Sequence, residues 1–148
     1  MIKQKLFQTI SGCKSWEDIY QNLKCINDVD QNLAGDLFEH FCQAYYLTES
    51  NSLHKDVWLF DDIPLDIKKK LRFKPKLEKG VDLVIRSTEG TFSAVQCKFK
   101  NDQRKKLLWG KPDKLSHLFA DGRFCDDYIV FANTSANPCT PIPIGRCK

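Results

Sequence analysis

The feature that most constrains the fold is a pair of apolar segments, residues 80–85 and 92–99, joined by a short polar turn. Both segments carry valine, isoleucine or phenylalanine, residues that favour β-strands. Thr88-Glu89-Gly90 between them forms a three-residue loop, and its final glycine suits the left-handed position of such a loop. The two segments therefore predict a β-hairpin.

The turn also predicts which residues of the two strands face each other. With Glu89 at its centre, counting outward places Asp82 opposite Gln96. The Cβ atoms of directly opposed residues lie about 5 Å apart. Lys98 points to the same face as Gln96, because side chains alternate along a strand. A bulge at Gly90 would shift the pairing by one residue and separate these groups.

An acid, an amide and a lysine in apolar strands are costly to bury unless they pair or bind a metal. Mg²⁺ takes oxygen ligands, usually one or two carboxylates together with waters and substrate phosphate. Asp82 supplies a carboxylate and Gln96 a neutral carbonyl oxygen. Lys98 can orient or deprotonate an attacking water, or neutralise charge on a phosphate. These residue types predict a site for metal-assisted phosphodiester hydrolysis.

Outside the hairpin, periodicity, capping residues and prolines predict helices and further strands. The helices begin at Ser15 (ending near Cys25), at Asp28 or Asp30 (ending near Leu47), at Pro64 (ending near Leu71) and at Pro112, and the strands cover residues 56–60 and 128–132. The hairpin strands are apolar on both faces, which indicates helices on both sides of the sheet. The predicted fold class is α/β, a three-layer α/β/α sandwich with a central mixed four-stranded sheet.

Glu39 lies in the second of these helices, at the edge of its apolar stripe. From position alone it is a boundary carboxylate. The three histidines show no ligand spacing, so we expect no metal site built on them.

The spacing of Asp82 and Gln96-x-Lys98, with thirteen residues between the first two, resembles the PD-(D/E)xK nuclease signature. Glutamine in place of the second acid is typical of the Mrr-like branch, and Val81 stands where the family name has proline. Residues 35–41 resemble the first core helix of this superfamily, whose glutamate reaches the metal site. Residues 57–64 and 79–82 are similar to nuclease domains that precede superfamily-two helicase modules. The resemblance covers roughly residues 15–135.

This resemblance implies a restriction-endonuclease-like fold and a metal-dependent DNA endonuclease. The implied catalytic residues are Glu39, Asp82, Gln96 and Lys98. Of these, Asp82, Gln96 and Glu39 would hold Mg²⁺, which Mn²⁺ can replace, and Lys98 would assist the attacking water. DNA is the expected partner, with a homodimer and a helicase or motor domain as further ones. Two alternatives stay open: a catalytically weak or inactive nuclease-like module that binds DNA beside a helicase, and a domain that acts only through protein contacts.

The net charge of +4 and pI near 8.6 permit nucleic-acid binding without requiring it. Basic residues after the hairpin are predicted to contact DNA phosphates, namely Lys100, Arg104, Lys105, Lys106 and Lys114. The earlier basic run at residues 68–76 is interpreted as a solvated face.

The length predicts one domain over residues 1–135, followed by a proline-rich tail or linker at 136–148. No apolar run approaches the ~20 residues of a membrane span, and no signal peptide is evident. The seven cysteines include no CxxC pair, which argues against a zinc site and favours a reducing compartment. We therefore expect no membrane partner and a cytoplasmic location, or a nuclear one in a eukaryotic host.

Overall fold

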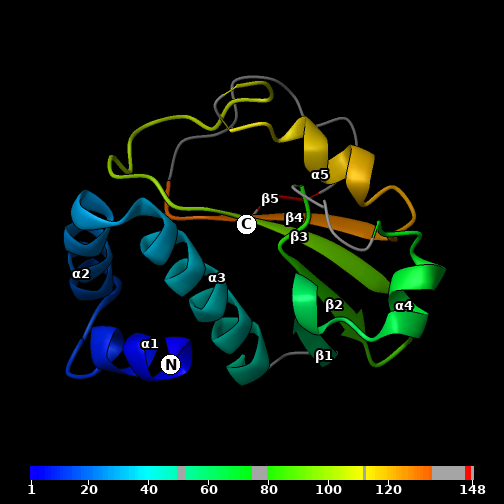
Figure 1. Cartoon of the computed structure of the whole chain (residues 1–148), viewed down its shortest axis with the longest axis horizontal. Helices are drawn as coiled ribbons and strands as arrows, with labels where there is room; N and C mark the ends of the chain where they lie inside the picture. The colour runs from blue at the N-terminus through cyan, green and yellow to red at the C-terminus, as the bar shows by residue number, and fades with distance from the viewer. Residues whose placement is uncertain (50–52, 75–79, 112, 135–145, 148) are drawn as a thin grey trace.

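The computed structural model describes residues 1–49, 53–74, 80–111, 113–134 and 146–147, and helices lie on both sides of a β-sheet (Figure 1). The helices are α1 (Ile2–Ile10), α2 (Trp16–Val29), α3 (Gln31–Thr48), α4 (Leu65–Lys70) and α5 (Ser116–Asp121), with a 3-10 turn η1 at Phe60–Asp62. The strands are β1 (His54–Leu59), β2 (Leu83–Ser87), β3 (Phe92–Lys98), β4 (Asp127–Ala132) and β5 (Arg146–Cys147). The predicted α/β class is confirmed.

The strands lie side by side in the order β1-β2-β3-β4-β5. Strands β1, β2 and β3 are antiparallel neighbours, whereas β3, β4 and β5 run parallel, so the sheet is mixed as predicted. The predicted strands are β1 to β4. The short β5 comes from the segment predicted to be a tail, and residues 135–145 and 148 lie outside the described residues. The domain boundary therefore stays a prediction.

Apolar side chains fill both faces of the sheet. Val84 and Ala94 are fully buried in the cluster beneath α4 and α5. Leu83 and Val95 are fully buried on the opposite face, beneath α3. A further cluster joins α1 and α2 to α3. This two-sided burial confirms the predicted layers, because a sheet covered on one face only would alternate apolar and polar residues.

The helices before the sheet begin where their capping side chains predict. Ser15 Oγ accepts a backbone hydrogen bond of 3.3 Å at the start of α2, and Asp30 Oδ1 accepts one of 3.1 Å at the start of α3. Helix α2 extends past Cys25, so its predicted end was wrong by one helical turn. The sequence does not predict α1, of which only Leu6 and Thr9 are buried.

The later elements differ from the predictions only in their ends. Helix α5 begins at Ser116, after the predicted start at Pro112, and Pro112 itself lies outside the described residues. No described helix has both the length and the apolar character that crossing a membrane would need.

The hairpin has the predicted register over its whole ladder. Leu83 pairs with Val95 and Val84 with Ala94. At the turn, Gly90 adopts φ +87°, the left-handed conformation that glycine accepts at no steric cost. The turn chemistry is therefore enough to set the pairing of β2 with β3.

Candidate active site

Asp82 lies just outside the hairpin ladder, at the start of β2. Its N–H donates to the Val95 carbonyl oxygen at 2.8 Å, one residue short of the predicted partner Gln96. Its own carbonyl accepts from the Phe60 N–H at 2.9 Å. Its carboxylate accepts from the Cys97 N–H at 2.7 Å. The predicted pairing of Asp82 with Gln96 is therefore wrong, because the chain bends at Asp82 to meet η1 and turns the carboxylate toward Cys97.

The approach to Asp82 depends on Gly80. A Cβ atom at this position would lie 2.2 Å from the His117 carbonyl oxygen, so only glycine lets the chain pass α5 this closely. The Gly80 N–H also donates to Asp121 Oδ2 at 3.0 Å. Helix α5 thus fixes the position of the segment that leads into Asp82.

Glu39 of α3 lies beside Asp82, close enough for each carboxyl group to shift the pKa of the other. Two carboxyl groups can form a hydrogen bond only when one of them carries a proton. Burial raises the pKa of Glu39 to about 9, with further contributions from the charge and hydrogen bond of Asp82 and the charges of Asp36 and Asp61. Burial also raises the pKa of Asp82, against the opposing effects of the Cys97 N–H, Glu39 and Lys98. Without a cation, the two carboxyls therefore share a proton.

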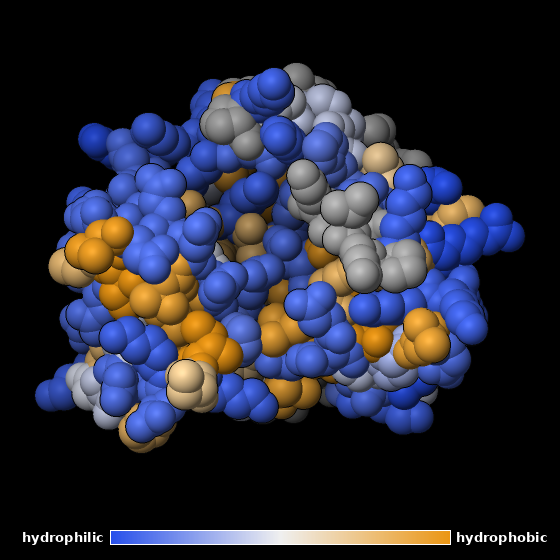
Figure 2. Space-filling view, in the orientation of Figure 1, coloured by the Kyte–Doolittle hydropathy of each residue, from blue (hydrophilic) through white to orange (hydrophobic). Residues whose placement is uncertain are grey.

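Two clefts, of about 350 and 440 Å³, share Asp36, Glu39 and Asp82 in their walls. Asp61 and His40 line the smaller cleft, and Cys97 and Lys98 line the larger. Figure 2 shows a hollow near the centre of this view with hydrophilic residues at its rim. The carboxyl pair is thus reached from two sides.

Gln96 stands apart from the other three predicted catalytic residues. Its side chain is 1% exposed and lines neither cleft. Its amide oxygen Oε1 is buried and has no hydrogen-bond partner among the residues that the structure describes. An unsatisfied buried acceptor costs about 1–3 kcal/mol, a cost that a contact with a cation would remove.

The donors at this site fit a hard divalent cation. The two carboxyl groups in the cleft walls are ligand types of Mg²⁺ and Mn²⁺ rather than of zinc, whereas the unpartnered amide oxygen of Gln96 lies outside both clefts. The described residues contain no group of three or more histidine, cysteine or acidic side chains placed to hold a metal. Waters and substrate phosphate would have to complete the coordination shell, as is usual for Mg²⁺.

The predicted DNA-binding residues differ in whether their charged groups already form ion pairs and in how exposed they are. Lys100 Nζ forms an ion pair with Asp113, which is 3% exposed, so this ammonium is already engaged inside the protein. Arg104 pairs at 3.1 Å with Asp102 and remains 90% exposed. Three further lysines are exposed and take part in none of the ion pairs seen among the described residues, namely Lys105, Lys106 and Lys114.

Sequence reasoning missed several residues near the carboxyl pair. Asp36 lies one helical turn before Glu39, and this i, i+3 spacing of acids was a usable signal. Asp61 lies in η1, two residues after the end of β1, and lines the smaller cleft. Nothing in the sequence pointed to Asp113, which pairs with Lys100 and also accepts from the Leu108 N–H at 2.7 Å.

A family model described as restriction endonuclease matches residues 48–137, more than half of the 148-residue chain. The match contains Asp82, Gln96 and Lys98, whereas Glu39 precedes it. No curated protein and no solved structure matches the chain. The family match and the mixed sheet flanked by helices agree with each other, and the chain belongs to the restriction endonuclease family.

Proposed function

We propose that this protein is a metal-dependent DNA endonuclease. The observation that carries the proposal is the half-buried Glu39–Asp82 carboxyl pair, set between two clefts with Lys98 in the wall of one. Two acids that must share a proton in the metal-free protein are arranged to accept a divalent cation in place of that proton. Membership of the restriction endonuclease family makes DNA the expected substrate.

Asp82, Glu39 and Gln96 would hold Mg²⁺, which Mn²⁺ can replace. When bound, the cation would polarise the phosphate and lower the pKa of a water molecule. The remaining roles fall to the protein. The Cys97 N–H fixes the orientation of the Asp82 carboxylate through its 2.7 Å hydrogen bond. Lys98 orients the attacking water and offsets the negative charge that develops on the phosphate.

The exposed cations after β3 would hold the DNA backbone. Lys105, Lys106 and Lys114 project from the segment that follows the site, and Arg104 lies beside them. Lys100 contributes by fixing this segment to Asp113 rather than by touching phosphate. Contacts of this kind position a duplex without reading its sequence.

The test is cleavage of supercoiled plasmid in Mg²⁺, compared among the wild type, Asp82→Asn, Lys98→Ala and a control variant, Lys69→Ala. Lys69 is an exposed lysine of α4. We expect nicking by the wild type and Lys69→Ala, none with EDTA, and none by the other two variants, which should still shift DNA in a gel. Wild-type cleavage rates in Lys98→Ala would contradict the assigned role of Lys98.

A second candidate is a nuclease-like module that binds DNA without cutting it. It is favoured by the position of Gln96 outside both clefts and by the lack of a three-acid cluster in the described ranges. Stable DNA binding with no nicking in Mg²⁺ or Mn²⁺ would support it. Either candidate function is compatible with a homodimer or with a helicase partner. Sedimentation with and without DNA would detect the dimer.

A further inference from the structure

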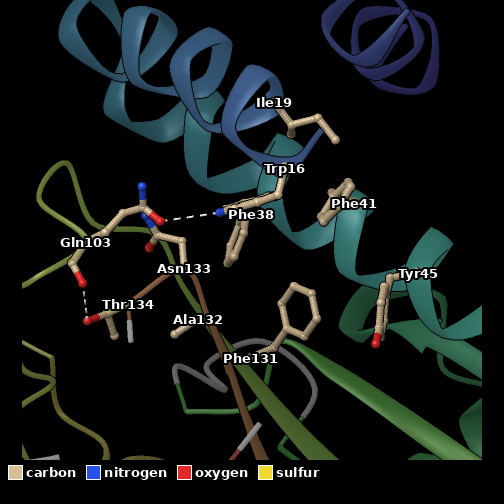
Figure 3. Close-up of a pocket in the computed structure, with 10 residues that line it drawn as sticks. All are labelled: Trp16, Ile19, Phe38, Phe41, Tyr45, Gln103, Phe131, Ala132, Asn133 and Thr134. Atoms are coloured by element: carbon tan, nitrogen blue, oxygen red, sulfur yellow. Dashed lines mark hydrogen bonds between the residues drawn. The ribbon is translucent and has the colours of Figure 1, made fainter. Parts of the chain in front are cut away.

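A second cavity, of about 580 Å³, lies on the other flank of α3 from the carboxyl pair. Figure 3 shows aromatic side chains from two helices and a strand around it. Its walls include Trp16 of α2, Phe41 and Tyr45 of α3, and Phe131 of β4. The volume falls in the usual range of small-ligand pockets, about 300–1,000 Å³.

The aromatic walls of this cavity are partly open to solvent. Trp16 is 36% and Tyr45 46% exposed. Phe131 packs against Tyr45 with ring centroids 5.6 Å apart, so the rings form one connected surface. Exposing this much aromatic surface to water costs free energy. A flat aromatic ligand could cover the surface by stacking on the rings.

The side chain of Gln103 supplies a hydrogen-bond donor at the rim of the cavity. The Trp16 indole N–H donates to Gln103 Oε1 at 3.3 Å (Figure 3). An indole nitrogen can only donate, so the oxygen of Gln103 is the acceptor and its amide NH₂ group is left over. This NH₂ has no partner among the described residues. Because Gln103 lines the cavity, this NH₂ is a hydrogen-bond donor at its rim.

The cavity rim and the basic segment are held together by hydrogen bonds. Asn133 lines the cavity and binds the Lys100 backbone through both of its amide atoms, at 2.7 Å each. Thr134 donates to the Gln103 carbonyl at 2.8 Å. Arg104 and Lys105 follow Gln103 directly and are exposed. A ligand in the cavity that carries phosphate would therefore have cations beside it.

The cavity is also next to the proposed catalytic cleft. Strands β3 and β4 are parallel, with Cys97 paired to Phe131 and Lys98 to Ala132. Cys97 and Lys98 line the cleft, whereas Phe131 and Ala132 line the cavity. The strands that line the two sites are thus adjacent, one strand spacing or roughly 5 Å apart, and both sites lie at the carboxyl ends of these parallel strands.

We propose that this cavity receives an unpaired nucleobase of the nucleic acid whose backbone lies on the basic segment. Stacking on Trp16 and Tyr45 holds the base, and the Gln103 amide donates to its edge. The proposal rests on the proposed function, because the base belongs to a nucleotide at or beside the phosphate in the catalytic cleft. It predicts a preference for DNA with an unpaired base at the cleavage position over a perfect duplex.

The test measures binding in EDTA to a short duplex with one bulged deoxyadenosine and to the same duplex with a bulged abasic nucleotide. Base stacking on aromatic side chains is worth about 1–3 kcal/mol, so the wild type should bind the bulged base about 5- to 150-fold tighter than the abasic bulge. Tyr45→Ala should lose this ratio and Tyr45→Phe should keep it. Phe124→Ala, which removes a 40% exposed phenylalanine outside the cavity, is the matched control and should keep it too.

Thermal melts of each variant separate a loss of folding from a loss of base binding. Equal wild-type affinity for the two bulges, or an unchanged ratio in Tyr45→Ala, would overturn the proposal. Because no cleavage is needed, the outcome is independent of catalysis. A base preference without any nicking would uphold the pocket and refute the endonuclease, whereas nicking without a base preference would do the reverse.

Discussion

Replacing Asp82 by asparagine should make the metal-free protein more stable at high pH while abolishing its response to metal. The asparagine keeps an oxygen to accept the 2.7 Å hydrogen bond from the Cys97 N–H, and its NH₂ can donate to Glu39. The substitution therefore removes charge with little change in shape. A group that serves folding alone would not give this combination of gain and loss.

The direction and size of the effect follow from Glu39. Its pKa is about 9 in the folded protein against an ordinary 4.5, so unfolding between these pH values releases a proton and stability falls as pH rises. The full shift corresponds to about 6 kcal/mol at 1.36 kcal/mol per unit. Burial is the largest cause, and the charge and hydrogen bond of Asp82 come next, so removing the Asp82 charge should lower the pKa of Glu39. Between pH 5 and pH 9, Asp82→Asn should therefore lose less stability than the wild type.

Urea unfolding at pH 5, 7 and 9, with and without Mg²⁺, measures both effects. The control Asp66→Asn changes the net charge equally at an exposed position of α4 and should follow the wild type. Mg²⁺ should stabilise the wild type at pH 8 and leave Asp82→Asn unchanged. Parallel stability–pH curves for the wild type and Asp82→Asn would refute the shared proton.

Three further predictions concern the surroundings of the site. Gly80→Ala should destabilise the protein by about 1–3 kcal/mol in urea unfolding, because the added Cβ would lie 2.2 Å from a backbone oxygen. An unchanged stability would contradict the close approach of Gly80 to His117. Lys100→Met should cost about 3 kcal/mol by stranding the buried Asp113 carboxylate, whereas Arg104→Met, in an exposed pair, should have little effect; equal costs would contradict this difference. Lys105→Ala should lower the slope of log Kd against log salt for duplex DNA by about 1. An unchanged slope would show that Lys105 does not contact a DNA phosphate.

The sequence was sufficient for the hairpin because its information is local. Gly90 sets the turn, and the turn sets the pairing of Val84 with Ala94. The capping side chains of Ser15 and Asp30 likewise set the starts of α2 and α3 without reference to the rest of the fold. Helix α1 was missed although Ile2, Leu6 and Ile10 recur at helical spacing, because no capping side chain marks its start.

The candidate site was predictable only in part. The approach of Lys98 to Asp82 follows from strand geometry, but the bend at Asp82 depends on a hydrogen bond to Phe60, which the hairpin sequence cannot reveal. The contact with Glu39 came from the family resemblance, since position alone made it a boundary residue. The engagement of Lys100 by Asp113 is a tertiary contact with no local signal.

In the proposed function, the Glu39–Asp82 pair exchanges a shared proton for a divalent cation. Calorimetric titration of Mg²⁺ at pH 7.5, repeated in buffers of different ionisation enthalpy, counts the protons released on binding. We expect about one proton released per Mg²⁺ bound by the wild type, and none by Glu39→Gln, which has no acidic proton at this position to give up. Binding without proton release in the wild type, or the same release in Glu39→Gln, would contradict the account.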